Sequence, residues 1–344
     1  MTLEEIPNIT SDMIEKLRKL NIESVYQLAV QSPFELSSRY EDTSLDFNSA
    51  SVIIANARKI LTEHEVLGKE FSTADQVLDK RNNIIRYATG SDKFDSFLNG
   101  GFESQSITEL VGEFGSGKSQ ICHTLCIAAN KLMEISPHND AEKSNKHSTS
   151  GNIIFIDTEN TFRAERAYQI AEQKGLDPLT VLNTIYHCNV FNSEELESII
   201  DNLDKFIEQY NAKLVIIDSI ISLHRAEFSG RGTLAERQQR LGKTLNKLRR
   251  IADIYNIAVV ITNQVVSYAD SSHPGFDYMK AAGGNIVAHG STYRIFLRKS
   301  GKNRIATIED SPYQPYQRMK FYISENGIQD AISYKTQEES DSSW

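Results

Sequence analysis

The fold of this 344-residue chain is decided by one stretch, Gly112-Glu113-Phe114-Gly115-Ser116-Gly117-Lys118-Ser119. It fits the pattern G-x-x-x-x-G-K-[ST], in which glycines let backbone N–H groups curl around phosphate oxygens. Residues 106–111 predict a short strand before it, and Gln120 to Leu132 predict a helix with one apolar face after it. A strand, a glycine loop and a helix in this order indicate a nucleoside-triphosphate site. The alternative is a glycine turn that matches by chance.

The loop and the start of its helix supply the predicted ligands of ATP and magnesium. We expect the Lys118 ammonium to reach the outer phosphates and the Ser119 hydroxyl to ligate Mg2+. The residues predicted to bind the nucleotide are Gly112, Glu113, Phe114, Gly115, Ser116, Gly117, Lys118, Ser119 and Gln120. The expected cofactors are therefore ATP and Mg2+.

Two further strands lead into carboxylates. The strand Asn152–Asp157 is followed closely by Glu159, and the strand Lys213–Asp218 ends in Asp218 itself. Ligands of open α/β sheets bind at the carboxyl ends of the strands. We predict that Glu159 orients and deprotonates the attacking water, and that Asp218 holds magnesium directly or through water. For Glu159 the alternative is an acid that stabilises the N-terminus of the helix predicted over 162–173.

A fourth strand begins at Ile257 and ends in the amide pair Asn263 and Gln264. Gln264 is placed to sense the γ-phosphate, so Lys118, Glu159 and Gln264 are the predicted catalytic residues. Strands that are nearly continuous in Val and Ile, alternating with helices, specify a mostly parallel sheet with helices on both faces. The predicted fold class is therefore α/β, with a P-loop ATPase core.

The composition limits the class of protein. A length of 344 residues and a hydrophobic content of 40% predict two domains with a sizeable core. Three cysteines without a C-x-x-C pair argue against a disulfide framework and against a zinc site. No apolar run approaches the ~18 residues of a membrane span, and the start of the chain lacks signal-peptide features. We expect a soluble cytoplasmic protein without a membrane partner.

The charge distribution points to one basic segment. A net charge of -9 argues against a protein that coats nucleic acid with its whole surface, so any contact needs a local patch. Residues 224–250 hold six arginines and two lysines against two glutamates, a local balance of +6. Thr233 to Glu236 predicts a capping box that opens a helix with arginines outward. The residues predicted to face inward are Leu234, Leu241, Leu245 and Leu248. A solvated helix face is the alternative.

The N-terminal residues 1–61 predict a small all-helical domain. Met13, Ile14 and Leu17 recur at helical spacing, as do Val52, Ile53, Ala57 and Ile60. The segment from Ile6 to Thr10 resembles the hairpin of a helix-hairpin-helix module, which grips a DNA phosphate. Because Asn8 and Thr10 stand where glycines are usual, a packing domain is the alternative.

The remaining boundaries follow from composition. Residues 62–80 are polar and predict a linker, residues 81–331 form the ATPase core, and the polar tail 332–344 is expected to be disordered. Phe71 is unusual in a solvated linker unless something buries it. A neighbouring subunit and the chain's own core are the two alternatives.

Several motifs together carry a family resemblance. They are the glycine loop 112–120, Ile156 to Glu159 with Thr161 to Arg163, Ser229 to Gly232, Ile261 to Val266 and Gly283 to Thr292. In this order they resemble the RecA/RadA recombinase family in its archaeal form, over residues from about 1 to 331. The resemblance implies a RecA-type core behind a helix-hairpin-helix-like domain. It also implies a DNA-dependent ATPase that polymerises on single-stranded DNA and exchanges strands with homologous double-stranded DNA for recombination and repair.

The resemblance implies partners and residues as well. The implied partners are single-stranded and double-stranded DNA, further copies of the chain in a helical filament or ring, and recombination mediators, at a nucleoid-associated location. Phe71 and Ala74 resemble the anchor that each subunit inserts into its neighbour, and Arg166 would lie near the adenine. The residues implied to close over a neighbour's ATP are His289, Asp310 and Pro312. The residues implied to contact DNA are Arg225, Arg231, Arg237, Phe276, Lys280, Gly283 and Gly284.

The chain departs from the family pattern at three places. His187 to Val190 stand where small residues with an arginine are usual, so the socket for the anchor is altered. The loop 267–284 is less basic than a phosphate-binding loop, so its aromatics would act by stacking or wedging between bases. Tyr313 to Arg318 replace an acidic stretch, which puts a monovalent-cation site in doubt.

Two alternatives to a strand-exchange recombinase remain at this point. One is a paralogue that binds ATP and a recombinase filament as a regulatory adaptor without exchanging strands. The other is a P-loop switch unrelated to DNA. The presence of Glu159 and of both DNA loops argues against the first, and the +6 segment argues against the second.

Overall fold

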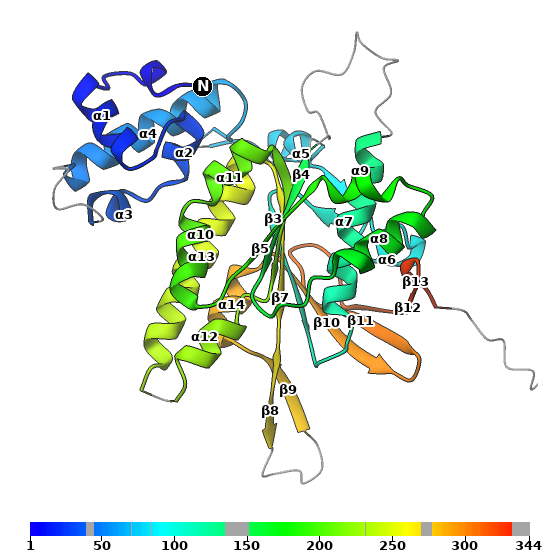
Figure 1. Ribbon diagram of the computed structural model, residues 1–344. Helices are drawn as coiled ribbons and strands as arrows, with labels where there is room; N and C mark the ends of the chain where they lie inside the picture. The colour runs from blue at the N-terminus through cyan, green and yellow to red at the C-terminus, as the bar shows by residue number, and fades with distance from the viewer. Residues whose placement is uncertain are drawn as a thin grey trace, which may run out of the picture.

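Figure 1 shows the chain as a computed structural model, in which a twisted central sheet carries helices on both sides and a small helical domain at one end. The structure describes residues 1–38, 45–69, 71–82, 84–134, 151–230, 232–269 and 277–331. Within these residues, no helix is long and apolar enough to cross a membrane.

The central sheet has nine strands. They are β3 (Ser106–Gly112), β4 (Asn152–Asp157), β5 (Ile185–Asn189), β6 (Ala212–Asp218), β7 (Ala258–Asn263), β10 (Tyr293–Ser300), β11 (Asn303–Asp310), β12 (Gln317–Ser324) and β13 (Gly327–Asp330). Their order is β13-β12-β11-β10-β3-β7-β6-β4-β5. The strands from β10 to β5 are parallel, and β11 to β13 extend the sheet in antiparallel fashion.

The parallel registers bring several strand ends to one edge. Val111 at the end of β3 pairs with Asn263, and Asp157 at the end of β4 pairs with Asp218. The glycine loop, the two predicted acids and the amide pair therefore share the carboxyl edge, where open α/β sheets bind ligands. Two short pairs complete the strands of the described residues: β1 (Arg86–Tyr87) with β2 (Phe102–Glu103), and β8 (Val265–Ala269) with β9 (Asp277–Ala281).

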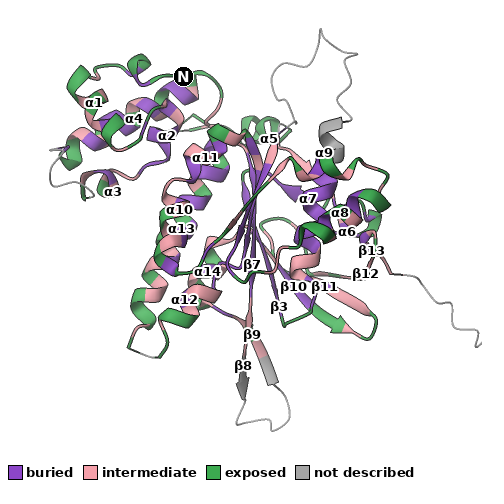
Figure 2. Ribbon diagram, viewed as in Figure 1, coloured by how far each residue is buried: buried purple, intermediate pink, exposed green. Residues whose placement is uncertain are grey.

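Helices cover both faces of the sheet, as Figure 2 shows by the purple strands between them. On one face lie α10 (Ser193–Asp201), α11 (Leu203–Tyr210), α12 (Ser222–Glu227), α13 (Leu234–Ile254) and α14 (Gly284–Gly290). On the other lie α6 (Asp92–Phe97), α7 (Lys118–Glu134), α8 (Ala164–Gln173) and α9 (Pro178–Leu182). Successive strand residues alternate between the two cores, for example Val215 in the first and Ile216 in the second. This architecture confirms the predicted α/β class with helices on both faces.

The first residues of the chain form short helices. They are η1 (Leu3–Glu5), α1 (Ser11–Lys19), α2 (Val25–Val30), α3 (Pro33–Ser38) and α4 (Phe47–Glu63). Asn8 adopts φ +61°, the left-handed conformation for which the hairpin would otherwise use glycine. Thr10 instead caps α1 by accepting a hydrogen bond from the Met13 amide. The inward position predicted for Val52 is wrong, because Val52 is exposed and Ile54 is buried on the same helix.

The predicted linker contains a helix. In α5 (Ala74–Arg81), Thr73 and Gln76 form a capping box in which each side chain accepts from the other's backbone amide. No residue of α5 is buried. The capping box therefore accounts for this helix. The prediction of residues 62–80 as a polar linker did not include it.

The basic segment is only partly exposed, which corrects in part the prediction that its arginines face outward. Lys247 is buried at 2% exposure, and Arg250 donates to the Val30 carbonyl at 2.6 Å and to Glu35 at 3.2 Å. Arg240 forms ion pairs with acidic neighbours. Lys247 and Arg250 therefore hold the N-terminal helices on the core, whereas Arg240 is bound to α10 and to its own helix.

The predicted start of α13 is also wrong in detail. Thr233 makes no side-chain cap, because its backbone is not extended and its hydroxyl donates to the Ser229 carbonyl at 3.1 Å. Leu234 is 39% exposed, whereas Leu241, Leu245 and Leu248 are buried as predicted.

Candidate active site

The glycine loop lies directly after β3 and is shaped by its neighbours. Gly112 has no room for a side chain, because a Cβ would lie 2.5 Å from the Leu297 carbonyl oxygen and 2.6 Å from Ser116 Oγ. Gly115 and Gly117 adopt φ of +71° and +109°, which residues other than glycine rarely adopt. The loop therefore brings its backbone close to any group bound in front of α7.

The groups in this loop fit a triphosphate. The Lys118 ammonium donates to the loop's own carbonyls, those of Gly112 at 2.8 Å and Glu113 at 3.0 Å. The buried Ser116 hydroxyl has no hydrogen-bond partner among the described residues. Helix α7 begins at Lys118, so its free amides face the same space. Burial lowers the pKa of Lys118, while the charges of Asp218 and Glu159 oppose that shift.

The residues present also fit magnesium. Among the described residues no group of three or more His, Cys, Asp or Glu side chains forms a metal cage. Mg2+ usually takes one or two protein oxygens together with phosphate and water oxygens, so Ser119 and Asp218 suffice. Asp218 is buried, and its two oxygens accept hydrogen bonds from Thr161 at 3.0 Å and from Thr262. This geometry favours contact of Asp218 with the metal through water.

Glu159 is held by two donors at the carboxyl edge. Its Oε1 atom accepts from Ser219 Oγ at 2.7 Å and from Gln264 Nε2 at 2.8 Å. The backbone amides of the turn are instead satisfied by Asp157, which accepts from Glu159 N, Thr161 N and Phe162 N at 2.8–3.1 Å. Helix α8 begins only at Ala164, with Arg163 as its N-cap residue, and Asp157 satisfies the amides of the turn before it. The alternative explanation of Glu159 as a helix N-terminal acid therefore has no geometric support.

Gln264 connects Glu159 to the basic segment. Its Oε1 atom accepts from Arg225 at 3.0 Å, while its Nε2 atom donates to Glu159. Arg225 lies on α12 and is half-buried. The three side chains form a continuous hydrogen-bonded path from a predicted DNA-binding residue to the predicted general base.

Of the other residues predicted to bind nucleotide, Arg166 lies beside the chain's own glycine loop and Asp310 lies two strands away from β3. Arg166 donates to Gln120 at 2.9 Å and to the backbone carbonyl of Ser324 at 2.5 Å, so it lies beside the end of the glycine loop. In the sheet, Asp310 of β11 lies opposite Arg294 of β10. Arg294 in turn lies opposite Glu109 of β3, three residues before Gly112.

The residues predicted to close over a neighbour's ATP are exposed and stand apart from the chain's own glycine loop. His289, Asp310 and Pro312 are all exposed. Helix α14 leads from Ala282, beside Gln264, back to Thr292, whose amide donates to the Ile107 carbonyl near the amino end of β3. His289 thus lies toward the end of β3 opposite the loop, and Asp310 lies two strands from β3, level with its middle residue Glu109.

The remaining predicted DNA-binding residues are placed in part. Arg237 is half-buried and donates to the Phe228 carbonyl at 3.2 Å, and Lys280 is exposed on β9. Gly283 and Gly284 adopt φ of +85° and +60°, and a Cβ on Gly283 would lie 2.4 Å from Val287. The predicted residues Arg231 and Phe276 and the tail 332–344 lie outside the described residues.

The linker residues are open to contact. Phe71 is 92% exposed and Ala74 is exposed, so Phe71 does not pack against the described part of its own chain. The alternative in which the chain's own core buries Phe71 is therefore not supported.

The structure adds residues that the sequence reading did not single out. Ser219 binds Glu159, Asp157 orders the turn, and His123 bridges the Ser119 carbonyl at 2.7 Å and the Arg163 amide at 3.1 Å. Ser219 follows the predicted residue Asp218, and Asp157 lies two residues before Glu159. Their position at the carboxyl ends of strands is the sequence signal that could have identified them. His123 sits one turn after Ser119 in α7, and no sequence signal separates it from core residues.

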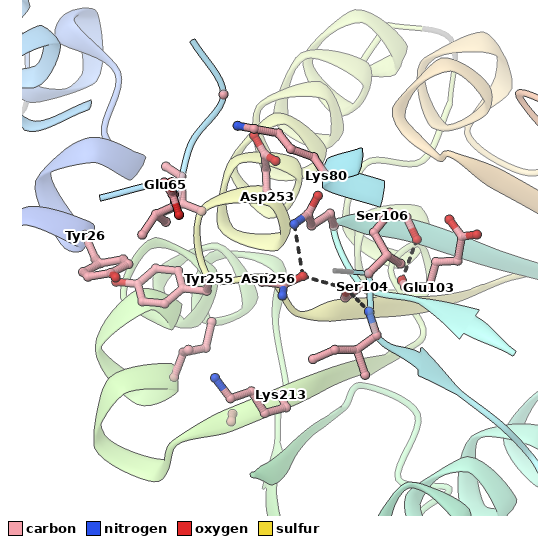
Figure 3. Close-up of a pocket in the computed structure, with 18 of the residues that line it drawn as sticks. Tyr26, Glu65, Lys80, Glu103, Ser104, Ser106, Lys213, Asp253, Tyr255 and Asn256 are labelled. Atoms are coloured by element: carbon pink, nitrogen blue, oxygen red, sulfur yellow. Dashed lines mark hydrogen bonds between the residues drawn. The ribbon is translucent and has the colours of Figure 1, made fainter. Parts of the chain in front are cut away.

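A cavity of about 1100 Å3 lies away from this site. Its lining includes residues from the amino ends of the sheet, such as Ser106 and Ala212, from α5, and from the N-terminal helices. Figure 3 shows Tyr26 and Tyr255 at one side of it and Glu103 at the other. Because the glycine loop lies at the opposite edge of the sheet, this cavity is separate from the nucleotide site.

The glycine loop after β3, the acids after β4 and β6, and the six-stranded parallel core define a RecA-type P-loop ATPase. The Rad51 family model matches residues 80–331. A protein named DNA repair and recombination protein RadA, from Cenarchaeum symbiosum (strain A), is 40% identical over 324 residues, which are 94% of this chain and 77% of that protein. The chain belongs to the Rad51 family, which confirms the predicted RecA/RadA resemblance.

Proposed function

We propose that the chain is an ATP-dependent DNA strand-exchange recombinase that forms filaments on single-stranded DNA in homologous recombination and repair. The observation that carries the proposal is the hydrogen-bonded path from Arg225 through Gln264 to Glu159. A side chain predicted to face DNA is thereby tied to the predicted general base. DNA binding at Arg225 would then change the position of Glu159, which is how DNA would stimulate hydrolysis.

The proposed mechanism relies on positioning and charge. ATP with Mg2+ supplies the phosphoryl group and a metal that neutralises its developing charge. Lys118 would leave its loop carbonyls for the outer phosphates, and Ser119 and Asp218 would hold the metal, the latter through water. Ser219 and Gln264 fix Glu159 Oε1, which leaves Oε2 to accept the proton of the attacking water.

The proposed partners are DNA and further copies of the chain. Phe71 and Ala74 would enter the neighbouring subunit, and His289, Asp310 and Pro312 would close over that neighbour's nucleotide. Their exposure, and the separation of His289 and Asp310 from the chain's own loop, support this arrangement. Recombination mediators and a nucleoid-associated place in the cytoplasm complete the proposal.

One experiment separates the proposal from the adaptor alternative. Strand exchange between homologous DNAs is measured with ATP, together with ATPase activity with and without single-stranded DNA. We expect exchange and DNA-stimulated hydrolysis. Nucleotide binding without exchange would favour an adaptor, and hydrolysis that ignores DNA would refute the role given to the path from Arg225.

A further inference from the structure

A buried carboxylate, Glu103, gathers four donors at the edge opposite the glycine loop. Its side chain is 3% exposed. Oε2 accepts from Arg81 at 3.0 Å and from Tyr293 at 2.7 Å, and Oε1 accepts from Arg86 at 3.0 Å and from Tyr313 at 2.9 Å. Both oxygens are therefore fully used, which is the arrangement that a buried carboxylate needs.

The donors come from four separate segments. Arg81 ends the linker helix α5, Arg86 lies in β1, Tyr293 begins β10, and Tyr313 lies in the loop between β11 and β12. Two of these segments matter for assembly: α5 begins three residues after Phe71, and the loop that carries Tyr313 follows Asp310, the last residue of β11. Glu103 thus joins the segment of the proposed anchor to the segment that is proposed to cover a neighbour's ATP.

Further contacts tighten the link between these two segments. The Arg81 guanidinium carbon lies 5.6 Å from the centre of the Tyr313 ring, within range of a cation–π interaction. Tyr313 also accepts from Asn99 Nδ2 at 3.4 Å, and the adjacent Gln314 donates to the Phe97 carbonyl at 3.1 Å. Tyr313 and Gln314, in the middle of the loop after Asp310, are therefore attached to residues at the end of α6.

We propose that Glu103 and Tyr313 are positioning residues that fix the linker helix and the 310–316 loop to each other, so that subunit docking and closure over the neighbour's ATP occur as one event. This inference rests on the proposed function.

The electrostatics of the site agree with a permanent charge at Glu103. Burial raises its pKa, but the hydrogen bonds from Tyr293, Tyr313 and Arg86 and the charge of Arg81 outweigh burial and lower the pKa overall. The carboxylate is thus charged at neutral pH and remains a strong acceptor for all four donors.

The test removes one hydroxyl. Tyr313→Phe keeps the ring and deletes the bond to Glu103 together with the longer bond from Asn99. Tyr316→Phe is the matched control because the exposed Tyr316 has no side-chain hydrogen bond in the described residues. ATPase activity with single-stranded DNA gives kcat and the KM for ATP. Light scattering gives the protein concentration at which filaments assemble. We expect Tyr313→Phe to raise both the KM and the assembly concentration by about tenfold, the size of one hydrogen bond to a charged group, with kcat at saturation unchanged.

A second variant guards against a simple folding defect. Arg81→Met removes the linker's donor, and it is combined with Tyr313→Phe in a double-mutant cycle. Coupled effects on the KM support the proposal. Values for Tyr313→Phe equal to those of Tyr316→Phe, a loss confined to kcat, or additive effects in the cycle would overturn it. If the wild-type chain shows neither filaments nor DNA-stimulated hydrolysis, the proposed function fails first and the inference fails with it.

Discussion

Glu159→Gln is the sharpest test of the chemistry. In the structure Oε1 of Glu159 accepts from Ser219 and from Gln264, and no backbone amide of the turn depends on this side chain. A glutamine carbonyl oxygen can occupy the same position and keep both hydrogen bonds. The substitution therefore removes the proton acceptor without removing its supports.

The expected magnitude follows from that role. A positioned general base contributes roughly 10²- to 10⁴-fold to the rate, which equals about 3–5 kcal/mol of activation free energy. The stability of the fold should change by less than about 0.5 kcal/mol, because the exposed side chain has the same shape and the same partners. ATP affinity should be retained, since Lys118 and the loop amides are untouched.

The assay is ATP turnover at saturating single-stranded DNA and Mg2+, with nucleotide binding measured separately by fluorescence. Glu165→Gln is the matched control, an exposed glutamate in the first turn of α8 that lacks any contact with the site in the described residues. Turnover of Glu159→Gln within a few-fold of the wild type, with DNA present, would refute the assignment of the base. Loss of ATP binding would refute the claim that the side chain acts only on the water.

Three further substitutions test DNA contact, assembly and domain docking. Neutralising Arg225 and Arg231 together should weaken single-stranded DNA binding and reduce its salt slope by about one to two units, and an unchanged slope would show that neither side chain contacts a DNA phosphate. Phe71→Glu should remove roughly 2–3 kcal/mol per subunit contact and dissolve filaments seen by electron microscopy, without unfolding a chain in which Phe71 is 92% exposed. Lys247→Met should lower the free energy of unfolding by about 3–5 kcal/mol in thermal denaturation, because it leaves Asp204 buried without the opposing charge, whereas the exposed Lys243→Met should not.

A local pattern can specify a geometry where one segment carries all of it. The glycine loop needs only its own positive-φ glycines and the helix that begins at Lys118, so a motif of eight residues specifies it. The carboxyl-edge position of Glu159 followed from the parallel order of the strands. Its partner Ser219 lies 60 residues away, and the pattern gives no information on that contact.

Capping patterns illustrate why local signals fail elsewhere. Thr73 and Gln76 fit the capping-box pattern, and so do Thr233 and Glu236, but only the first pair forms the box. Thr73 is extended, at φ -68° and ψ 156°, whereas Thr233 lies at φ -99° and ψ 1° because its hydroxyl is bound to the preceding turn. The pattern alone does not state which backbone conformation the preceding residues impose.

The distribution of charge in α13 shows how tertiary contacts alter the meaning of a composition count. The segment's balance of +6 suggested a continuous DNA-binding face, yet Lys247 and Arg250 point to the N-terminal helices and Arg240 to Glu197 and Glu236. Because a helix rises ~1.5 Å per residue, the part of α13 from Leu234 to Arg250 spans ~24 Å between the start of the helix and the domain contact. One rigid helix therefore joins the predicted DNA loop at its start to the docked N-terminal helices toward its end. Any displacement of the start of α13 on DNA binding must either move the N-terminal helices with it or break the buried contacts of Lys247 and Arg250.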